Sequence, residues 1–133
     1  MKRVRALVAR PVEECWRAFT DPAQLIEWVP GLRAAWLIEA NGDGLPREVQ
    51  FEFAKDFVYS LLYTYDAADH VVRWEPREAN HNAVRGFAQF AATDEGTEVT
   101  YALEHETGRK AAERAIDDPK LLVEAFVRFL YER

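Results

Sequence analysis

The sequence has one cysteine and no long hydrophobic run. Because Cys15 is the only cysteine among 133 residues, neither an internal disulfide nor a multi-cysteine metal site can form. No uninterrupted apolar run approaches the ~18 residues of a membrane span, and no apolar segment follows the N-terminal charges as in a secretion signal. We therefore expect a cytoplasmic protein without a membrane span, in which Cys15 is a buried small hydrophobic side chain.

Positive charge is also scarce. The chain has 17 Lys and Arg against 23 Asp and Glu, a net charge of −6, and no dense basic cluster. Because nonspecific nucleic-acid binding relies on neutralising phosphates, we expect no nucleic-acid partner. The three histidines lack the His-x-x-x-His spacing of a zinc site, and no glycine motif for phosphates or dinucleotides occurs. The sequence therefore predicts no metal ion and no cofactor.

Hydrophobic and aromatic residues are abundant, at 49% and 13% of the chain. Together with 30% charged residues, this composition excludes a disordered protein. A chain of 15.3 kDa buries about two-thirds of its unfolded surface when it folds. We expect one domain over residues 1–133, with a sizeable core.

A strand and two short helices are expected first. Residues 2–9 have strand character, and apolar residues spaced i, i+3, i+4 and i+7 predict a helix over 11–19. Asp21 followed by Pro22 predicts the cap and first turn of a second helix, which ends before Pro30.

Alternating apolar and polar residues then predict a run of antiparallel strands. The expected strands are 32–40, a segment around 49–53, 57–65, 70–76, 82–92 and 98–106. The inward face of 82–92 stays open at this stage. It is either Val84, Gly86, Ala88 and Phe90, or Arg85, Phe87 and Gln89.

From Gly108 onward the apolar period becomes helical, which predicts a long C-terminal helix over 109–131. Pro119 interrupts this helix and predicts a kink or a fresh start capped by Asp118. The fold class is therefore α+β. A curved antiparallel sheet of six to seven strands wraps on the long C-terminal helix, which covers its apolar face.

The order of elements and four short segments resemble the START-like superfamily, which includes polyketide cyclase/dehydrase-like, pollen-allergen-like and heat-shock-ATPase-activator-like proteins. The segments are 9–16, 19–22, Leu25 with Trp28, and 96–101. The resemblance covers nearly the whole chain and implies the helix-grip fold. In such proteins an apolar cavity lies between the sheet and the helix, and members carry lipids, steroids, polyketides or plant hormones, or catalyse cyclisation or dehydration.

Inward-facing aromatic residues are the candidate ligand-binding residues, because they would line a mostly apolar pocket with a few hydroxyls. They are Trp36, Phe51, Phe53, Tyr59, Tyr63, Trp74, Tyr101, Phe126 and Phe129. The same rings are also what a filled core requires, so an open and a filled cavity are both compatible with the sequence.

Catalytic candidates are fewer. His105 ends a strand on the same face as Tyr101, so it is a candidate general base with Tyr63 or Tyr101 as the acid. A histidine bonded to backbone at a strand end is the structural alternative. Arg85 would anchor an anionic group only if its strand takes the second register. The turn 80–82 is a candidate for the cavity mouth.

Three functions are compatible with these patterns and with what the family resemblance implies. The first is binding of a small hydrophobic ligand, such as a lipid, a polyketide or an aromatic molecule. The second is a cyclase- or dehydratase-type enzyme that uses cavity histidine and tyrosine. The third is a co-chaperone-like interaction module, which would need an exposed apolar patch on the outer face of the sheet or in the 77–83 loop. A monomer and a homodimer both remain open.

Overall fold

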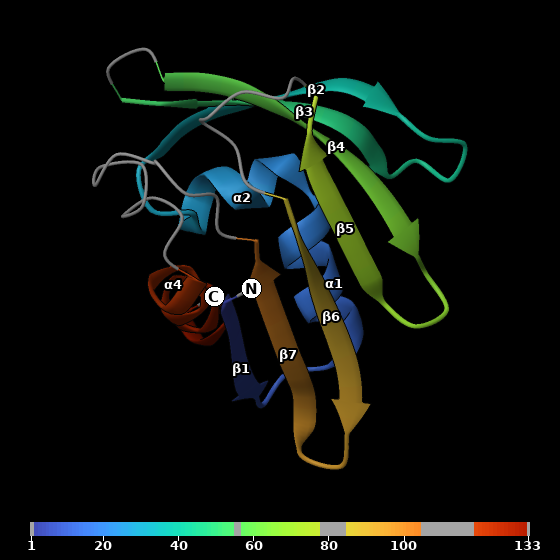
Figure 1. Ribbon diagram of the computed structural model, residues 1–133. Coiled ribbons are helices and arrows are strands. Elements are labelled where there is room, and N and C mark those ends of the chain that lie inside the picture. Colours follow the sequence, from blue (N-terminus) through green and yellow to red (C-terminus); the bar gives the residue numbers. More distant parts are fainter. Residues whose placement is uncertain (1, 55–56, 78–84, 105–118, 133) are drawn as a thin grey trace.

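The computed structural model describes residues 2–54, 57–77, 85–104 and 119–132, and their strands form one seven-stranded antiparallel sheet (Figure 1). The strands, in spatial order, are β1 (Lys2–Val8), β7 (Gly96–Leu103), β6 (Gly86–Thr93), β5 (Val71–Pro76), β4 (Phe57–Asp66), β3 (Pro46–Phe53) and β2 (Leu32–Ala40). The helices are α1 (Val12–Thr20), α2 (Pro22–Trp28) and α4 (Pro119–Glu132). The predicted α+β helix-grip architecture is confirmed.

The sheet curves around α1 and α2, and α4 lies against β1 and β7 (Figure 1). Pro119 is the first described residue of α4, so the kink or fresh start expected at this proline stays a prediction. The expected helix residues before Pro119 lie outside the described residues. None of the described helices is long and apolar enough to cross a membrane.

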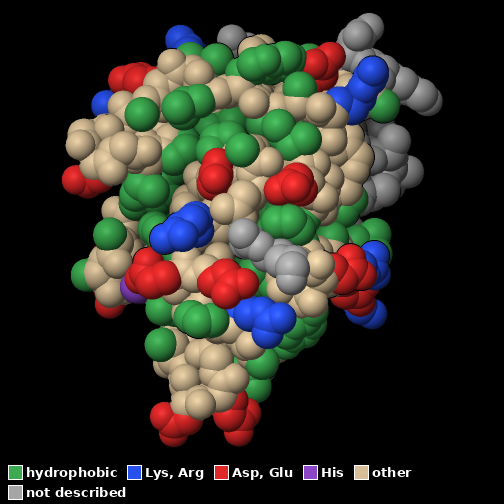
Figure 2. Space-filling view, turned by 180° about the vertical axis from the view of Figure 1, so that it is seen from behind, with side chains coloured by type: hydrophobic (Ala, Val, Ile, Leu, Met, Phe, Trp, Pro, Cys, Tyr) green, Lys and Arg blue, Asp and Glu red, His purple; other side chains and the backbone are tan. Residues whose placement is uncertain are grey.

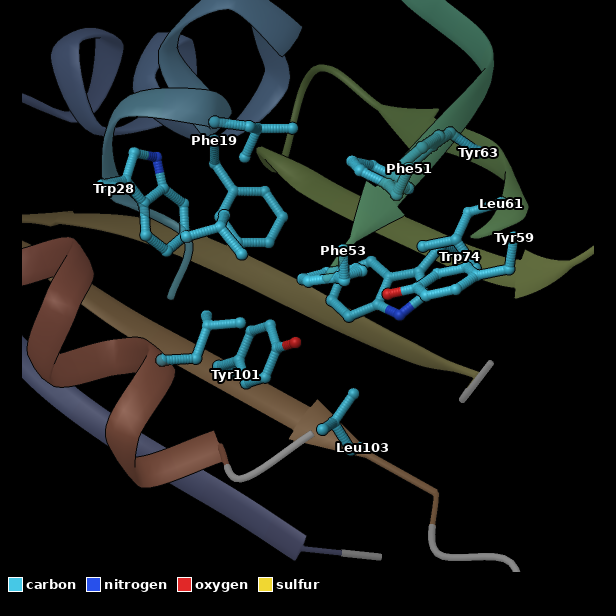
Figure 3. A pocket seen from close by; sticks show the side chains of 13 residues that line it. Phe19, Trp28, Phe51, Phe53, Tyr59, Leu61, Tyr63, Trp74, Tyr101 and Leu103 are labelled. Carbon is cyan, nitrogen blue, oxygen red and sulfur yellow. The ribbon is translucent and has the colours of Figure 1, made fainter. Parts of the chain in front are cut away.

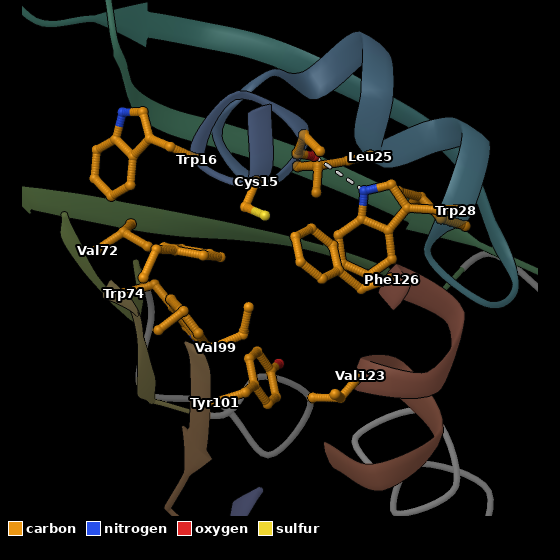
Figure 4. Packing of buried hydrophobic residues seen from close by; sticks show 14 of the residues in the cluster. Cys15, Trp16, Leu25, Trp28, Val72, Trp74, Val99, Tyr101, Val123 and Phe126 are labelled. Carbon is orange, nitrogen blue, oxygen red and sulfur yellow. Dashed lines mark hydrogen bonds between the residues drawn. The ribbon is translucent and has the colours of Figure 1, made fainter. Parts of the chain in front are cut away.

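The junction between α1 and α2 is held by local hydrogen bonds. Asp21 caps α2 as expected, because its Oδ1 accepts the backbone N–H of Ala23 at 3.0 Å. Pro11 is the N-cap of α1, so this helix begins one residue later than expected. The indole N–H of Trp28 donates to the carbonyl of Ala18 at 3.0 Å, which ties α2 to α1 (Figure 4).

The register of β6 settles which of its faces points inward. Ala88 and Phe90 are buried, whereas Gln89 is exposed. The first alternative for this strand is therefore correct, and Gly86 lies on the inner face directly opposite Trp74 of β5. Arg85, just before the strand, lies outside the core with a side chain that is 62% exposed.

The core lies between the sheet and the helices. Phe126 of α4 is 1% exposed and meets Trp28 with ring centroids 4.9 Å apart (Figure 4). Cys15 is fully buried, as expected, and burial raises the pKa of its thiol. Its role is packing, because a buried thiol with a raised pKa is a poor nucleophile.

Some large apolar side chains remain exposed. Seen from behind, hydrophobic side chains gather in the upper part of the surface, above a mixed band of acidic and basic ones (Figure 2). Trp36 of β2 is 48% exposed, so the prediction that it faces inward is wrong. It pairs with Gln50 of β3, and directly opposed residues share a face, while Phe51 next to Gln50 points inward.

Two of the exposed apolar side chains lie on the outer face of the sheet, on different strands. Trp36 and Val58 are both exposed there. In the register of the sheet they are separated by the polar side chains of Gln50 and Glu52 on β3. The 78–83 part of the loop that the interaction-module hypothesis invokes lies outside the described residues. The interaction-module hypothesis therefore stays a prediction.

Candidate ligand-binding cavity

A cavity of about 80 Å³ opens between β3, β4, β5 and β7 on one side and the helices on the other (Figure 3). Every described lining residue is aliphatic or aromatic. They are Phe19, Leu25, Trp28, Val29, Phe51, Phe53, Tyr59, Leu61, Tyr63, Trp74, Tyr101, Leu103 and Leu122. Leu122 is the contribution of α4, and Phe19, Leu25 and Trp28 come from α1 and α2.

Strand register places the aromatic rings beside one another. Phe51 of β3 pairs directly with Tyr59 of β4, and Phe53 stacks on the same tyrosine with ring centroids 5.7 Å apart. Further along β4, Tyr63 pairs directly with Trp74 of β5. Because opposed residues in an antiparallel pair lie on one face, these alternating aromatic residues form a continuous wall.

Small residues on β6 complete this wall. Trp74 pairs with Gly86 and Tyr101 pairs with Ala88, so β6 offers at most a methyl group between them. Trp74 therefore reaches across β6 and stacks on Tyr101 of β7, with ring centroids 5.4 Å apart and the planes 30° apart. A Cβ atom at Gly86 would lie 2.8 Å from the Trp74 ring, so glycine is required for this stacking.

The cavity is electrically neutral in its described part, because no charged side chain is among its lining residues. Burial raises the pKa of Tyr101, and it raises the pKa of Tyr63 well above the usual value. Both phenols therefore stay protonated near neutral pH. They are suited to hydrogen bonding with a ligand and unsuited to acting as general bases.

Six of the nine predicted ligand-binding residues meet at this cavity: Phe51, Phe53, Tyr59, Tyr63, Trp74 and Tyr101. Trp36 faces away, as described above. Phe126 and Phe129 do not line the cavity: Phe126 is buried among Trp28, Phe19 and Phe90, and Phe129 packs partly buried at the edge of the core.

The lining residues from the two short helices were not predicted. Phe19, Leu25 and Trp28 lie on apolar helix faces that the sequence pattern does reveal. The pattern assigns them to packing, because helical periodicity shows which face is buried and not whether a cavity adjoins it.

The structure also locates the catalytic candidates that it describes. The register in which Arg85 would point inward is not the one observed, and its guanidinium lies 3.6 Å from the Glu75 carboxylate and 3.9 Å from that of Glu104, outside the core. Tyr63 and Tyr101 line the cavity. His105 and the 80–82 turn lie outside the described residues, so no described base faces the two tyrosines.

Residues 3–131 match the model of the family described as polyketide cyclase / dehydrase and lipid transport. The chain belongs to this family. The match spans almost the entire chain and agrees with the START-like resemblance of the sequence.

Several solved structures have the same fold as this protein, although their sequences are only distantly similar to it. A START superfamily protein from Mycobacterium smegmatis is 13% identical, with a TM-score of 0.77 over 98% of this chain and 97% of that one. A protein from Thermus thermophilus is 14% identical, with a TM-score of 0.78 over 98% and 96%. An AHSA1-like protein from Aeromonas hydrophila is 15% identical, with a TM-score of 0.67 over 98% and 92%. No sequence among curated proteins matches this chain.

Proposed function

We propose that this protein binds a small hydrophobic molecule in the cavity between the sheet and its helices. The observation that carries the proposal is the apolar and aromatic lining, which brings together side chains from three helices and four strands. Ligand sites are typically concave and mostly apolar, with few polar groups. Membership of a family described by polyketide cyclisation and lipid transport supports the same conclusion.

The volume of the cavity limits the size of the ligand that it can hold. At about 80 Å³ it is smaller than the ~150 Å³ engineered cavity known to bind benzene, and far below the ~300–1,000 Å³ of sites for larger ligands. A single aromatic ring is accommodated by small side-chain shifts. A long acyl chain or a fused ring system requires more space than the described arrangement offers, so we favour a one-ring ligand.

Ligand binding in the cavity is tested by titrating toluene into the wild-type protein and into two variants that carry a tryptophan on α4. Leu122 lines the cavity, so the Leu122→Trp variant fills it with a larger side chain. Leu121 is the neighbouring residue and is 50% exposed, so Leu121→Trp adds the same side chain outside the cavity. Calorimetric titration should show toluene binding by wild type and Leu121→Trp, and binding weakened about tenfold or more by Leu122→Trp.

Two results would contradict the proposal. One is the absence of toluene binding by the wild-type protein at concentrations up to the solubility limit. The other is equal binding by the two tryptophan variants, which would place the binding site elsewhere on the surface. Circular dichroism of both variants checks that they are folded before the affinities are compared.

A further inference from the structure

The cavity contains a buried hydroxyl without a partner among the described residues. Tyr101 is 6% exposed, and its hydroxyl points into the space enclosed by the lining side chains (Figure 3). Within the part of the chain that the structure describes, this hydroxyl takes part in no hydrogen bond. A buried polar group normally has a partner, because leaving it unpaired costs free energy. The described lining of the cavity therefore leaves one polar position for another molecule to satisfy.

Tyr63 supplies a second hydroxyl to the same cavity. Its side chain is partly buried, and its hydroxyl likewise forms no hydrogen bond among the described residues. Burial raises the pKa of Tyr63, and the phenols of Tyr65, Tyr59 and Tyr101 raise it further. Two protonated phenols thus face one small apolar space from β4 and β7.

Tyr65 lies on the same strand as Tyr63, but its hydroxyl has a hydrogen-bond partner within the protein. Its hydroxyl donates to the backbone carbonyl of Pro46, and the residue is not among those that line the cavity. The contrast within β4 is informative, because the same residue type is paired with the protein at position 65 and directed to the cavity at position 63. Tyr63 and Tyr101 therefore differ from a tyrosine that merely completes the core.

We propose that Tyr101, together with Tyr63, is the polar subsite of the cavity and selects an uncharged one-ring ligand that carries a hydroxyl or carbonyl oxygen. This inference rests on the proposed function. A phenolic O–H both donates and accepts, so it pairs with either group. No described lining side chain is charged, so a carboxylate or ammonium group would enter without a counter-ion and would be disfavoured.

The test compares phenol, toluene and benzoate as probes for wild type and two variants. Phenol and toluene present a hydroxyl or a methyl group of similar size on the same ring. Tyr101→Phe removes one hydroxyl from the cavity, and Tyr65→Phe is the matched control that removes a hydroxyl outside the cavity. Calorimetric titration should show that Tyr101→Phe weakens phenol binding about three- to tenfold and leaves toluene binding unchanged. Tyr65→Phe should change the ratio of the two affinities by less than about twofold, and benzoate should not bind.

The outcomes separate this inference from the proposed function. If wild type and Tyr101→Phe bind phenol equally while toluene still binds, the polar subsite is wrong and the hydrophobic site stands. Benzoate binding as tight as that of phenol would also overturn the subsite. If wild type binds neither toluene nor phenol, both the proposed function and the subsite are wrong.

Thermal unfolding without ligand provides a second readout. Because the Tyr101 hydroxyl has no described partner to lose, Tyr101→Phe should unfold at or above the wild-type temperature. Tyr65→Phe should unfold at a lower temperature, since it loses the bond to Pro46. A drop for Tyr101→Phe as large as that for Tyr65→Phe would indicate a structural partner and overturn the inference.

Discussion

Phe126 and Trp36 are both large aromatic residues on regular elements, but their surroundings differ. Phe126 is 1% exposed and contacts the rings of Trp28, Phe19 and Phe90. Trp36 is 48% exposed on the edge strand β2. The free energy gained by burying a side chain scales with the apolar area removed from water, so the two residues contribute very differently to stability.

Truncating the two residues should show this difference. We expect Phe126→Ala to lower the free energy of unfolding by about 3–5 kcal/mol, because it leaves a cavity in the core. Trp36→Ala should lower it by less than about 1 kcal/mol. Urea denaturation followed by circular dichroism measures both values. Equal losses would mean that the burial of one of these rings is misassigned.

The strand β6 shapes the cavity wall because its residues Gly86 and Ala88 are small. This central strand presents Gly86 and Ala88 to the inner face, flanked by Trp74 on β5 and Tyr101 on β7. The absence of larger side chains at these two positions lets the aromatic rings stack across the strand. The aromatic stacking in the cavity wall therefore depends on β5, β6 and β7 together.

Adding one methyl group to β6 should disturb this arrangement. A Cβ at Gly86 would lie 2.4 Å from the backbone oxygen of Ala102 and 2.8 Å from the Trp74 ring. We expect Gly86→Ala to destabilise the protein by about 1–3 kcal/mol and to weaken toluene binding. Gly42→Ala is the control, since no described atom lies within 4 Å of its Cβ, and it should change stability by about 0.5 kcal/mol or less. A Gly86→Ala variant as stable as wild type would show that β6 relaxes freely.

For the protein as a whole, the buried tyrosines link stability to alkaline pH. Burial raises the pKa values of Tyr63 and Tyr101 above the ordinary value of 10.0 that applies to the unfolded chain. Above pH 10 the unfolded state therefore releases protons that the folded state retains. The unfolded state is stabilised as a result, so the free energy of unfolding falls as the pH rises beyond 10.

This dependence is measurable by urea denaturation at pH 8 and pH 11. We expect the wild-type protein to lose stability between these values. The Tyr63→Phe/Tyr101→Phe double variant should lose distinctly less, because it lacks the two buried phenols. If the two proteins lose the same amount of stability, the buried tyrosines are not the source of the alkaline sensitivity.

Local residue patterns were enough to identify the elements and their main buried faces. Alternation of polar and apolar residues identified the strands, and the aspartate and proline signal at Asp21 and Pro22 identified the start of α2. The hydrophobic period and the helix-capping signals depend on residues only a few positions apart, so they can be recognised within a single segment of the sequence. For the same reason six of the cavity residues could be named, all of them on strands with clear alternation or clustered aromatics.

Which residues meet in space could be learned only from the folded chain. In β2 the run from Ala34 to Ile38 is apolar throughout, so no alternation shows that Trp36 faces outward; its pairing with Gln50 decides it. The inner face of β6 was likewise fixed by its neighbours Trp74 and Tyr101. The direction of Tyr101 into the cavity and the bond of Tyr65 to Pro46 are also non-local. Register and packing join residues far apart in the chain, whereas periodicity reports only that two faces differ.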